Sequence, residues 1–136
     1  MTDTTTHDRP RLLIADDDPV VQSMLGMRLG EQFEVVGVAV DGEQAVTLAR
    51  ESQPDVALVD VEMPSGGGLR AVQGITEVAP ATAIVILSGD ESDSVVRQLI
   101  QAGATAYRRK GARAEEIAAS LTESIEAHGR ARGGGS

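Results

Sequence analysis

Short apolar runs, each about the length of a β-strand, constrain the fold of this chain more than any other feature. They lie at Arg11–Ala15, Val35–Val40, Val56–Val59 and Ala83–Leu87, and a weaker run spans Thr105–Tyr107. Within each run the apolar residues are consecutive and do not alternate with polar ones, which is typical of strands covered on both faces. The sequence therefore predicts a parallel sheet with helices packed on both sides.

Helical periodicity fills the segments between these runs. Asp18 before Pro19 matches an N-cap and a first-turn proline, Asp41 is placed to cap a second helix, and Gly103 to end a fourth. The expected apolar faces carry Val20, Val21, Met24, Leu25 and Leu29; Ala45, Val46, Leu48 and Ala49; Leu69, Val72, Ile75 and Thr76; Val95, Val96, Leu99 and Ile100; and Ile117, Ala118, Leu121 and Ile125. This alternation predicts the α/β class, as a doubly wound five-stranded parallel sheet in a (βα)5 flavodoxin-like three-layer sandwich.

The length of 136 residues fits one compact domain. We expect a disordered N-terminal segment at residues 1–10, a folded domain at 11–128, and a flexible linker or tag at the Gly- and Arg-rich residues 129–136. The first segment is polar and lacks the basic start and apolar stretch of a signal peptide, so we expect a cytoplasmic protein.

The formal net charge of −9 argues against direct binding to nucleic acid, whose phosphates are held by clustered Lys and Arg. It argues equally against an anionic membrane surface. The chain contains no cysteine, which excludes disulfides and thiolate metal sites. Its only aromatic residues are Phe33 and Tyr107, so the core must be aliphatic.

Polar residues follow the predicted strands where those strands end. Asp16 and Asp17 follow the first strand, Asp60 the third and Ser88 the fourth, and Lys110 comes soon after the fifth. The carboxyl ends of parallel strands meet at one edge of the sheet, where ligands of such folds bind. We therefore expect three carboxylates, a hydroxyl and an ammonium group to converge there.

This combination has a clear chemical use, although each residue alone has an ordinary structural explanation as a cap, a turn residue or a solvated side chain. Crowded carboxylates repel one another unless a cation lies between them, and Mg²⁺ prefers oxygen ligands. One carboxylate can then attack phosphorus and form an acyl phosphate. Lys110 and Ser88 would help the metal to neutralise the transferring group.

Four blocks of the sequence resemble the receiver domains of response regulators. They are Leu12-Leu13-Ile14-Ala15-Asp16-Asp17-Asp18-Pro19, Val59-Asp60-Val61-Glu62-Met63-Pro64 with Gly68-Leu69, Ile86-Leu87-Ser88-Gly89, and Gly103-Ala104-Thr105-Ala106-Tyr107 with Lys110. The blocks follow the order and spacing of the chemotaxis-Y-like family of two-component signalling. The resemblance covers about residues 11–128.

The resemblance implies a role for each matching residue. Asp60 would be the phosphoacceptor, with Ser88 and Lys110 contacting the phosphoryl oxygens. Asp17, Asp60 and the backbone carbonyl of Glu62 would ligate Mg²⁺, or Mn²⁺ as an alternative, and Asp16 would act mainly through a metal-bound water. Tyr107 would be an aromatic switch that turns inward as Ser88 moves.

Some positions depart from the commonest family pattern. Gly111 stands where many receivers have proline, which puts the loop geometry after Lys110 in question, and Gly89 replaces the usual alanine. Glu62 and Asp90 occupy places that flank the phosphoryl group and are both acidic. We hypothesise that their charges modulate the lifetime of the phosphoryl group.

The resemblance implies a signalling receiver that is not a conventional enzyme and catalyses only its own phosphorylation and dephosphorylation. Its partners would be a sensor histidine kinase or histidine phosphotransfer protein, and an output domain or target protein read through the fourth helix, fifth strand and fifth helix. Homodimerisation through the aliphatic fourth or fifth helix remains open, as does the choice between a stand-alone regulator and part of a longer one.

Two other functional classes compete with this interpretation. Aspartyl-nucleophile phosphatases of the haloacid dehalogenase type usually carry a second Asp two residues after the first, where this chain has Glu62. A vestigial receiver could act as a phosphorylation-independent interaction module, but the complete set of site residues argues against it. The sequence lacks the Gly-rich Lys-Ser/Thr motif of a nucleotide-binding P-loop after the first strand.

Overall fold

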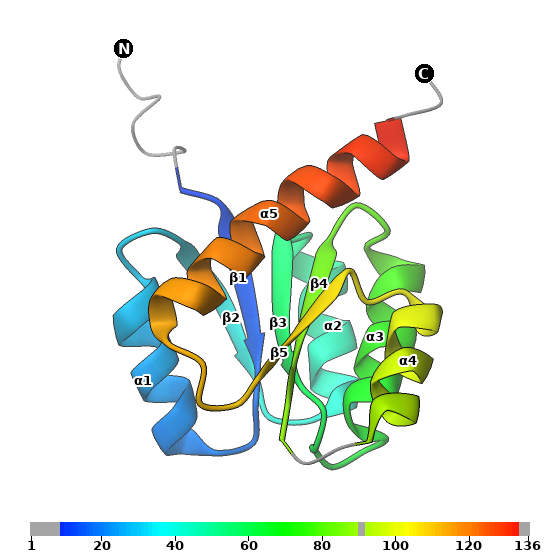
Figure 1. Cartoon of the computed structure of the whole chain (residues 1–136), viewed down its shortest axis with the longest axis horizontal. Helices are drawn as coiled ribbons and strands as arrows, with labels where there is room; N and C mark the ends of the chain where they lie inside the picture. The colour runs from blue at the N-terminus through cyan, green and yellow to red at the C-terminus, as the bar shows by residue number, and fades with distance from the viewer. Residues whose placement is uncertain (1–8, 90–91, 134–136) are drawn as a thin grey trace.

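The computed structural model describes residues 9–89 and 92–133, which form alternating strands and helices (Figure 1). The elements in chain order are β1 (Arg11–Ala15), α1 (Pro19–Leu29), β2 (Glu34–Ala39), α2 (Gly42–Ser52), β3 (Val56–Asp60), α3 (Gly67–Val78), β4 (Ala83–Ser88), α4 (Asp93–Ala102), β5 (Ala106–Arg109) and α5 (Ala114–Gly133). Each predicted apolar run coincides with a strand to within two residues at either end.

The five strands form one parallel sheet in the order β2-β1-β3-β4-β5. The order changes direction between β1 and β3, because β2 is added to one side of β1 and the later strands to the other. Right-handed crossovers then place helices on opposite faces of the sheet. This is the predicted doubly wound, flavodoxin-like arrangement, and it leaves a crevice at the carboxyl ends of β1 and β3.

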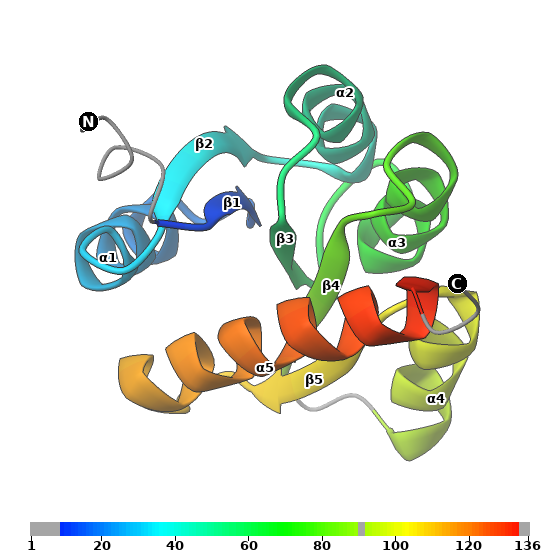
Figure 2. The same cartoon turned by 90° about the horizontal axis from the view of Figure 1, so that it is seen from above.

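Two hydrophobic cores fill the spaces between the three layers. Helices α2, α3 and α4 cover one face of the sheet, and α1 and α5 cover the other (Figure 2). The central strands contribute alternate side chains to the two cores: Leu13 and Ala57 face the first, whereas Leu12 and Leu58 face the second. This explains why the strand sequences are apolar without a break. Phe33 is fully buried in the second core, among aliphatic side chains.

The predicted helix ends are confirmed by local hydrogen bonds. Asp18 accepts a hydrogen bond from the backbone N–H of Val20, and Pro19 begins α1. Asp41 accepts from the N–H of Gln44 at the start of α2. Gly103 ends α4 with φ of 132°, a backbone conformation that favours glycine. Each cap satisfies backbone groups that would otherwise lack a partner.

The expected linker at residues 129–136 needs correction, because α5 continues to Gly133. Once a helix has formed, adding a residue costs little, and Arg130, Ala131 and Arg132 are good helix formers. Residues 134–136 lie outside the described part of the chain, as do residues 1–8 of the expected N-terminal segment. Arg9 is described, and its guanidinium donates to the carbonyl of Gly30 at 2.6 Å.

No helix in the described ranges combines the length and the apolar character needed to cross a bilayer.

Helices α2 and α3 approach each other closely at Gly74. A Cβ atom at this position would lie 2.2 Å from Cγ2 of Val46 and 3.1 Å from its Cγ1. We therefore expect Gly74→Ala to lower the free energy of unfolding by about 1–2 kcal/mol, even though alanine favours a helix by about 1 kcal/mol over glycine. Urea unfolding of the variant measures this loss.

Gly26 in α1 provides a matched control, since a Cβ atom there meets nothing within 4 Å. Gly26→Ala should be neutral or stabilising. In addition, Val46→Ala should cost less in the Gly74→Ala background than in the wild type, because it removes the clashing methyl groups. A Gly74→Ala variant at least as stable as Gly26→Ala would show that the approach of the two helices is not limiting.

Candidate functional site at the carboxyl edge of the sheet

Three carboxylates meet at the crevice between β1 and β3. Asp16 and Asp17 follow β1, and Asp60 is the last residue of β3. Each of the three offers an oxygen atom, and these oxygens all lie within 4.8 Å of one another. Asp16 and Asp60 are buried, whereas Asp17 is exposed. The structure thus brings together the three acids that the sequence analysis placed at this edge.

Asp16 is a buried carboxylate with few hydrogen bonds to stabilise its charge. Its Oδ1 accepts a hydrogen bond from the backbone N–H of Asp18 at 2.9 Å, but Oδ2 is buried without a hydrogen-bond partner among the described residues. Burial raises the pKa of Asp16 above its ordinary value, the N–H of Asp18 opposes the shift, and the nearby charge of Asp60 adds to it. A buried oxygen without a partner is costly unless a cation approaches it.

Lys110 provides the positive charge of the site. Its Nζ lies 2.8 Å from Oδ1 of Asp60, and the same Oδ1 accepts from the N–H of Glu62 at 3.2 Å. Burial by itself would lower the pKa of Lys110, but the hydrogen bond and the charge of Asp60 outweigh it and raise that pKa. The lysine therefore stays charged beside the buried carboxylate.

The loop after Lys110 takes a conformation suited to its glycine. Gly111 has φ of 97°, whereas the proline found there in many receivers is fixed near −65°. Lys110 itself is anchored by its backbone N–H, which donates to the carbonyl of Ser88 at 2.8 Å. The departure at Gly111 thus changes the course of the loop without removing the lysine from the site.

Ser88 and Tyr107 occupy neighbouring strands at the same edge. Ser88 ends β4 and is fully buried. Tyr107 lies in β5 opposite Ile86, with 43% of its surface exposed. The guanidinium of Arg109 donates to the carbonyl of Gly89 at 2.7 Å and makes a longer contact of 3.4 Å with Oγ of Ser88. Sequence analysis did not single out Arg109, because an arginine in an edge strand normally indicates only a solvated position.

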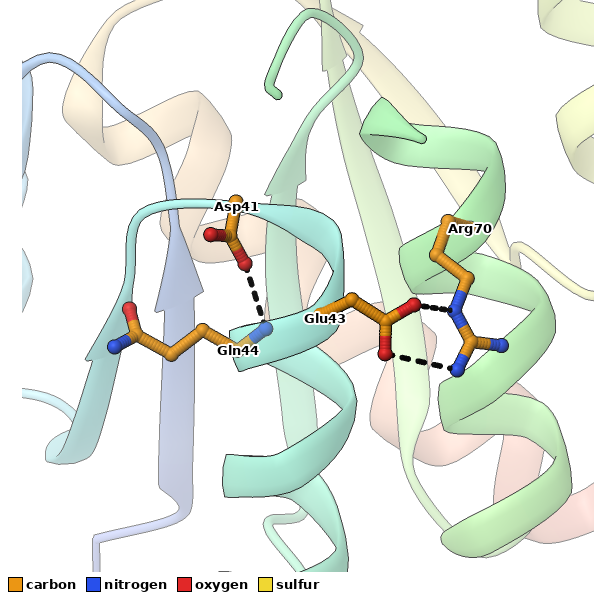
Figure 3. Close-up of polar contacts among 4 residues, drawn as sticks. All are labelled: Asp41, Glu43, Gln44 and Arg70. Atoms are coloured by element: carbon orange, nitrogen blue, oxygen red, sulfur yellow. Dashed lines mark hydrogen bonds and ion pairs between the residues drawn. The ribbon is translucent and has the colours of Figure 1, made fainter. Parts of the chain in front are cut away.

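The connection from β3 to α3 carries Glu62 and is held against the start of α2. The N–H of Gly42 donates to the carbonyl of Pro64 at 3.1 Å. Beside this contact, Arg70 of α3 forms an ion pair with Glu43 of α2 at 2.5 Å (Figure 3). The hydrogen bond from Arg70 lowers the pKa of Glu43. Asp90, the other predicted modulator, lies outside the described residues.

The donor set fits a hard divalent cation. Carboxylate oxygens are the ligands that Mg²⁺ prefers, and three of them converge here around one lysine. The partnerless Oδ2 of Asp16 is the kind of atom that a cation and its bound water would satisfy. The cluster is therefore compatible with a divalent cation such as Mg²⁺.

The sequence matches the response regulator receiver domain over residues 12–122. The chain belongs to this family. The match includes the first part of α5 and the whole sheet apart from Arg11, so the receiver fold and the two-component context are established for this domain.

Relatives of the receiver include a response regulator and solved receiver domains. The chain is 37% identical over 115 residues to "Response regulator GacA" from Pseudomonas aeruginosa, covering 83% of this chain and 54% of the relative. It thus spans about half the length of the curated relatives it matches. A CheY-like receiver domain protein from Methanospirillum hungatei superposes with a TM-score of 0.82 at 21% identity, covering 90% and 98% of the two chains.

A second solved structure bears on the metal. The receiver domain of the sensor histidine kinase PA1611 from Pseudomonas aeruginosa superposes with a TM-score of 0.77 at 26% identity, covering 87% of this chain and 98% of that one. In that structure a magnesium ion is coordinated in the active-site cleft. The present receiver has an acidic cluster compatible with the same kind of ion.

Proposed function

We propose that this receiver accepts a phosphoryl group on Asp60 in a Mg²⁺-dependent reaction and so switches the face formed by Ser88 and Tyr107. The observation that carries the proposal is the position of Asp60, a buried carboxylate within 4.8 Å of two other acids and 2.8 Å from an ammonium group. A carboxylate with a purely structural role does not require two further acids and an ammonium group around it. A phosphoryl acceptor requires both, because the acids hold a metal ion and the ammonium group stabilises the phosphoryl oxygens.

The metal would be held by Asp17, Asp60 and the backbone carbonyl of Glu62, with Asp16 acting through a bound water. When bound, Mg²⁺ supplies positive charge that offsets the carboxylates and the incoming phosphoryl oxygens. Mn²⁺ offers the same coordination chemistry as an alternative. The rest of the chemistry belongs to the side chains of the chain itself.

The phosphoryl transfer is assigned to Oδ2 of Asp60, because Oδ1 accepts from both Lys110 and the N–H of Glu62. The Oδ2–P bond forms as the N–P bond of a phosphohistidine breaks, and the electron pair of that bond stays on the histidine ring. The Lys110 ammonium group and the Ser88 hydroxyl then donate to separate oxygens of the phosphoryl group. Their charge and hydrogen bond stabilise the acyl phosphate.

The partners that we propose follow from this chemistry. The phosphodonor is a sensor histidine kinase or a histidine phosphotransfer protein, and an output domain or target protein reads α4, β5 and α5. Beside the site, a cavity of about 390 Å³ lies between α1 and the start of α5. Met24 lines this cavity together with Asp16 and Lys110, and the exposed side chains of Met24 and Met27 on α1 give a donor protein an apolar surface beside the site. Homodimerisation and a cytoplasmic location belong to the same proposal.

Labelling of the purified protein tests this function directly. We expect acetyl phosphate and Mg²⁺ to add one phosphoryl group per chain, with the sensitivity to alkali and hydroxylamine of an acyl phosphate. Chelation of the metal with EDTA should reduce the labelling rate at least about 100-fold. Mass spectrometry of the intact protein measures both. A vestigial interaction module would remain unlabelled, and a haloacid dehalogenase-type phosphatase would instead hydrolyse generic phosphate esters continuously.

The acidic residues Glu62 and Asp90 are expected to set the lifetime of the phosphoryl group. Their negative charges either repel the phosphoryl oxygens or align the attacking water, so neutralising them should change the dephosphorylation rate about two- to tenfold. Following the decay of labelled wild type, Glu62→Gln and Asp90→Asn measures this effect. Equal lifetimes in all three proteins would remove the proposed role.

A further inference from the structure

Ser88 lies in β4, between the strand that carries Asp60 and the strand that carries Arg109. On one side β4 pairs with β3, where Asp60 stands opposite Leu87. On the other side β4 pairs with β5, where Ser88 itself stands opposite Arg109. Because β4 runs between them, a hydroxyl group that turns towards Asp60 turns away from Arg109.

In this structure, the guanidinium group of Arg109 contacts the residues at the end of β4. Its Nη1 atom donates to the Gly89 carbonyl at 2.7 Å, a short charge-assisted bond, and lies 3.4 Å from Oγ of Ser88. Ser88 is fully buried, whereas Arg109 is exposed, so the arginine reaches in from the surface. One guanidinium group thus bridges the switch hydroxyl and the first carbonyl after it.

We propose that Arg109 is a positioning residue that holds Ser88 and Gly89 in the conformation of the unmodified receiver. The inference rests on the proposed phosphorylation of Asp60 and adds a regulator of the same site. A phosphoryl group on Asp60 places its oxygens on the β3 side of Ser88. To donate to these oxygens the hydroxyl group rotates towards β3, and this rotation lengthens its 3.4 Å contact with Arg109 on the β5 side.

A contact present in only one of two states shifts the equilibrium between them towards that state. Arg109 therefore opposes the active conformation, and any ligand that requires this conformation must overcome its hydrogen bonds. Beryllofluoride is such a ligand, since with Mg²⁺ it mimics a phosphoryl group on an aspartate. Removing the guanidinium group should increase the affinity for beryllofluoride, even though a positive charge near an anionic ligand is lost.

The test is a beryllofluoride titration of wild type, Arg109→Met and Arg108→Met in Mg²⁺. Arg108→Met is the matched control. It removes the same charge from the adjacent position of β5, and within the described residues Arg108 makes no hydrogen bond to Ser88. Fluorescence of Tyr107 reports on the switch, since it is the only tyrosine and the chain has no tryptophan. Fluorine-19 NMR of the bound ligand measures occupancy independently of Tyr107.

We expect the dissociation constant of Arg109→Met to be about fivefold lower than that of wild type, and that of Arg108→Met to stay within about twofold of it. Arg109→Lys keeps the charge but lacks the planar guanidinium group that bridges the Gly89 carbonyl and Oγ of Ser88. This variant should therefore also bind beryllofluoride more tightly than the wild type. Unchanged or weaker binding by both Arg109 variants overturns the inference. Failure of the wild type itself to bind beryllofluoride would instead count against the proposed function.

Discussion

Replacing Asp60 by asparagine is expected to abolish labelling of the receiver by acetyl phosphate. The amide nitrogen and oxygen are poor nucleophiles towards phosphorus, and the substitution changes the shape of the side chain very little. Asp60 is buried, and its oxygens face Lys110, Asp16 and Asp17. Intact-mass measurements over the labelling period of the wild type should show no phosphorylated Asp60→Asn protein.

The same substitution should leave the fold intact and can raise its stability. A neutral amide removes one negative charge from three crowded carboxylates, although it also weakens the contact with Lys110. Glu51→Gln is a matched control, because it converts an exposed carboxylate to an amide at the C-terminal end of α2, which leads into the start of β3 and so lies at the opposite edge of the sheet from the site. Phosphorylation of Asp60→Asn at another residue, at a rate near that of the wild type, would contradict the assignment of the acceptor.

Replacing Lys110 by methionine is expected to slow labelling by about 100-fold, because an ammonium group that stabilises the developing charge is lost. Methionine has an unbranched side chain of similar length but carries no charge. Without Mg²⁺ the variant should also lose about 1–2 kcal/mol of unfolding free energy, since Asp60 is left buried without its counter-ion. The loss is limited because 41% of the Lys110 side chain is exposed and its ion pair is partly screened.

A double-mutant cycle separates the ion pair from the packing of the lysine stem. Lys110→Met should cost less than about 0.5 kcal/mol in the Asp60→Asn background, where no buried charge remains to be paired. Urea unfolding of the wild type, both single variants and the double variant at neutral pH gives the coupling energy. An equal cost of Lys110→Met in both backgrounds would show that the 2.8 Å contact contributes packing only.

Arg109 is the residue that we propose to regulate the switch at this site. Lys110 and Arg109 are adjacent in sequence, but their cationic groups engage different parts of the switch. Lys110 contacts Asp60, the proposed acceptor, whereas Arg109 contacts Gly89 and Ser88 on the β5 side of β4. We therefore expect substitutions at the two positions to act in opposite directions, with Lys110 favouring the modified state and Arg109 the unmodified one.

The sequence by itself was sufficient to predict the sheet, its helices and the edge at which the site lies. Unbroken apolar runs such as Leu12–Ala15 are typical of strands covered on both faces, and the caps at Asp18 and Asp41 mark helix starts by local hydrogen bonding. Since parallel strands all end at one edge, Asp16, Asp17 and Asp60 had to converge. These properties depend on local periodicity and on topology, which a sequence carries directly.

Other features depended on which side chains meet across the sheet and between helices. The bond from Arg109 to Gly89 requires the β4–β5 register, and the close approach of Gly74 to Val46 requires the packing of α3 on α2. The continuation of α5 to Gly133 overrode a composition typical of linkers. Such contacts join residues distant in sequence, and no local pattern encodes their distances. Periodicity and strand order thus determined where the site lies, whereas only tertiary packing decided which oxygen of Asp16 lacks a partner and which cation faces Ser88.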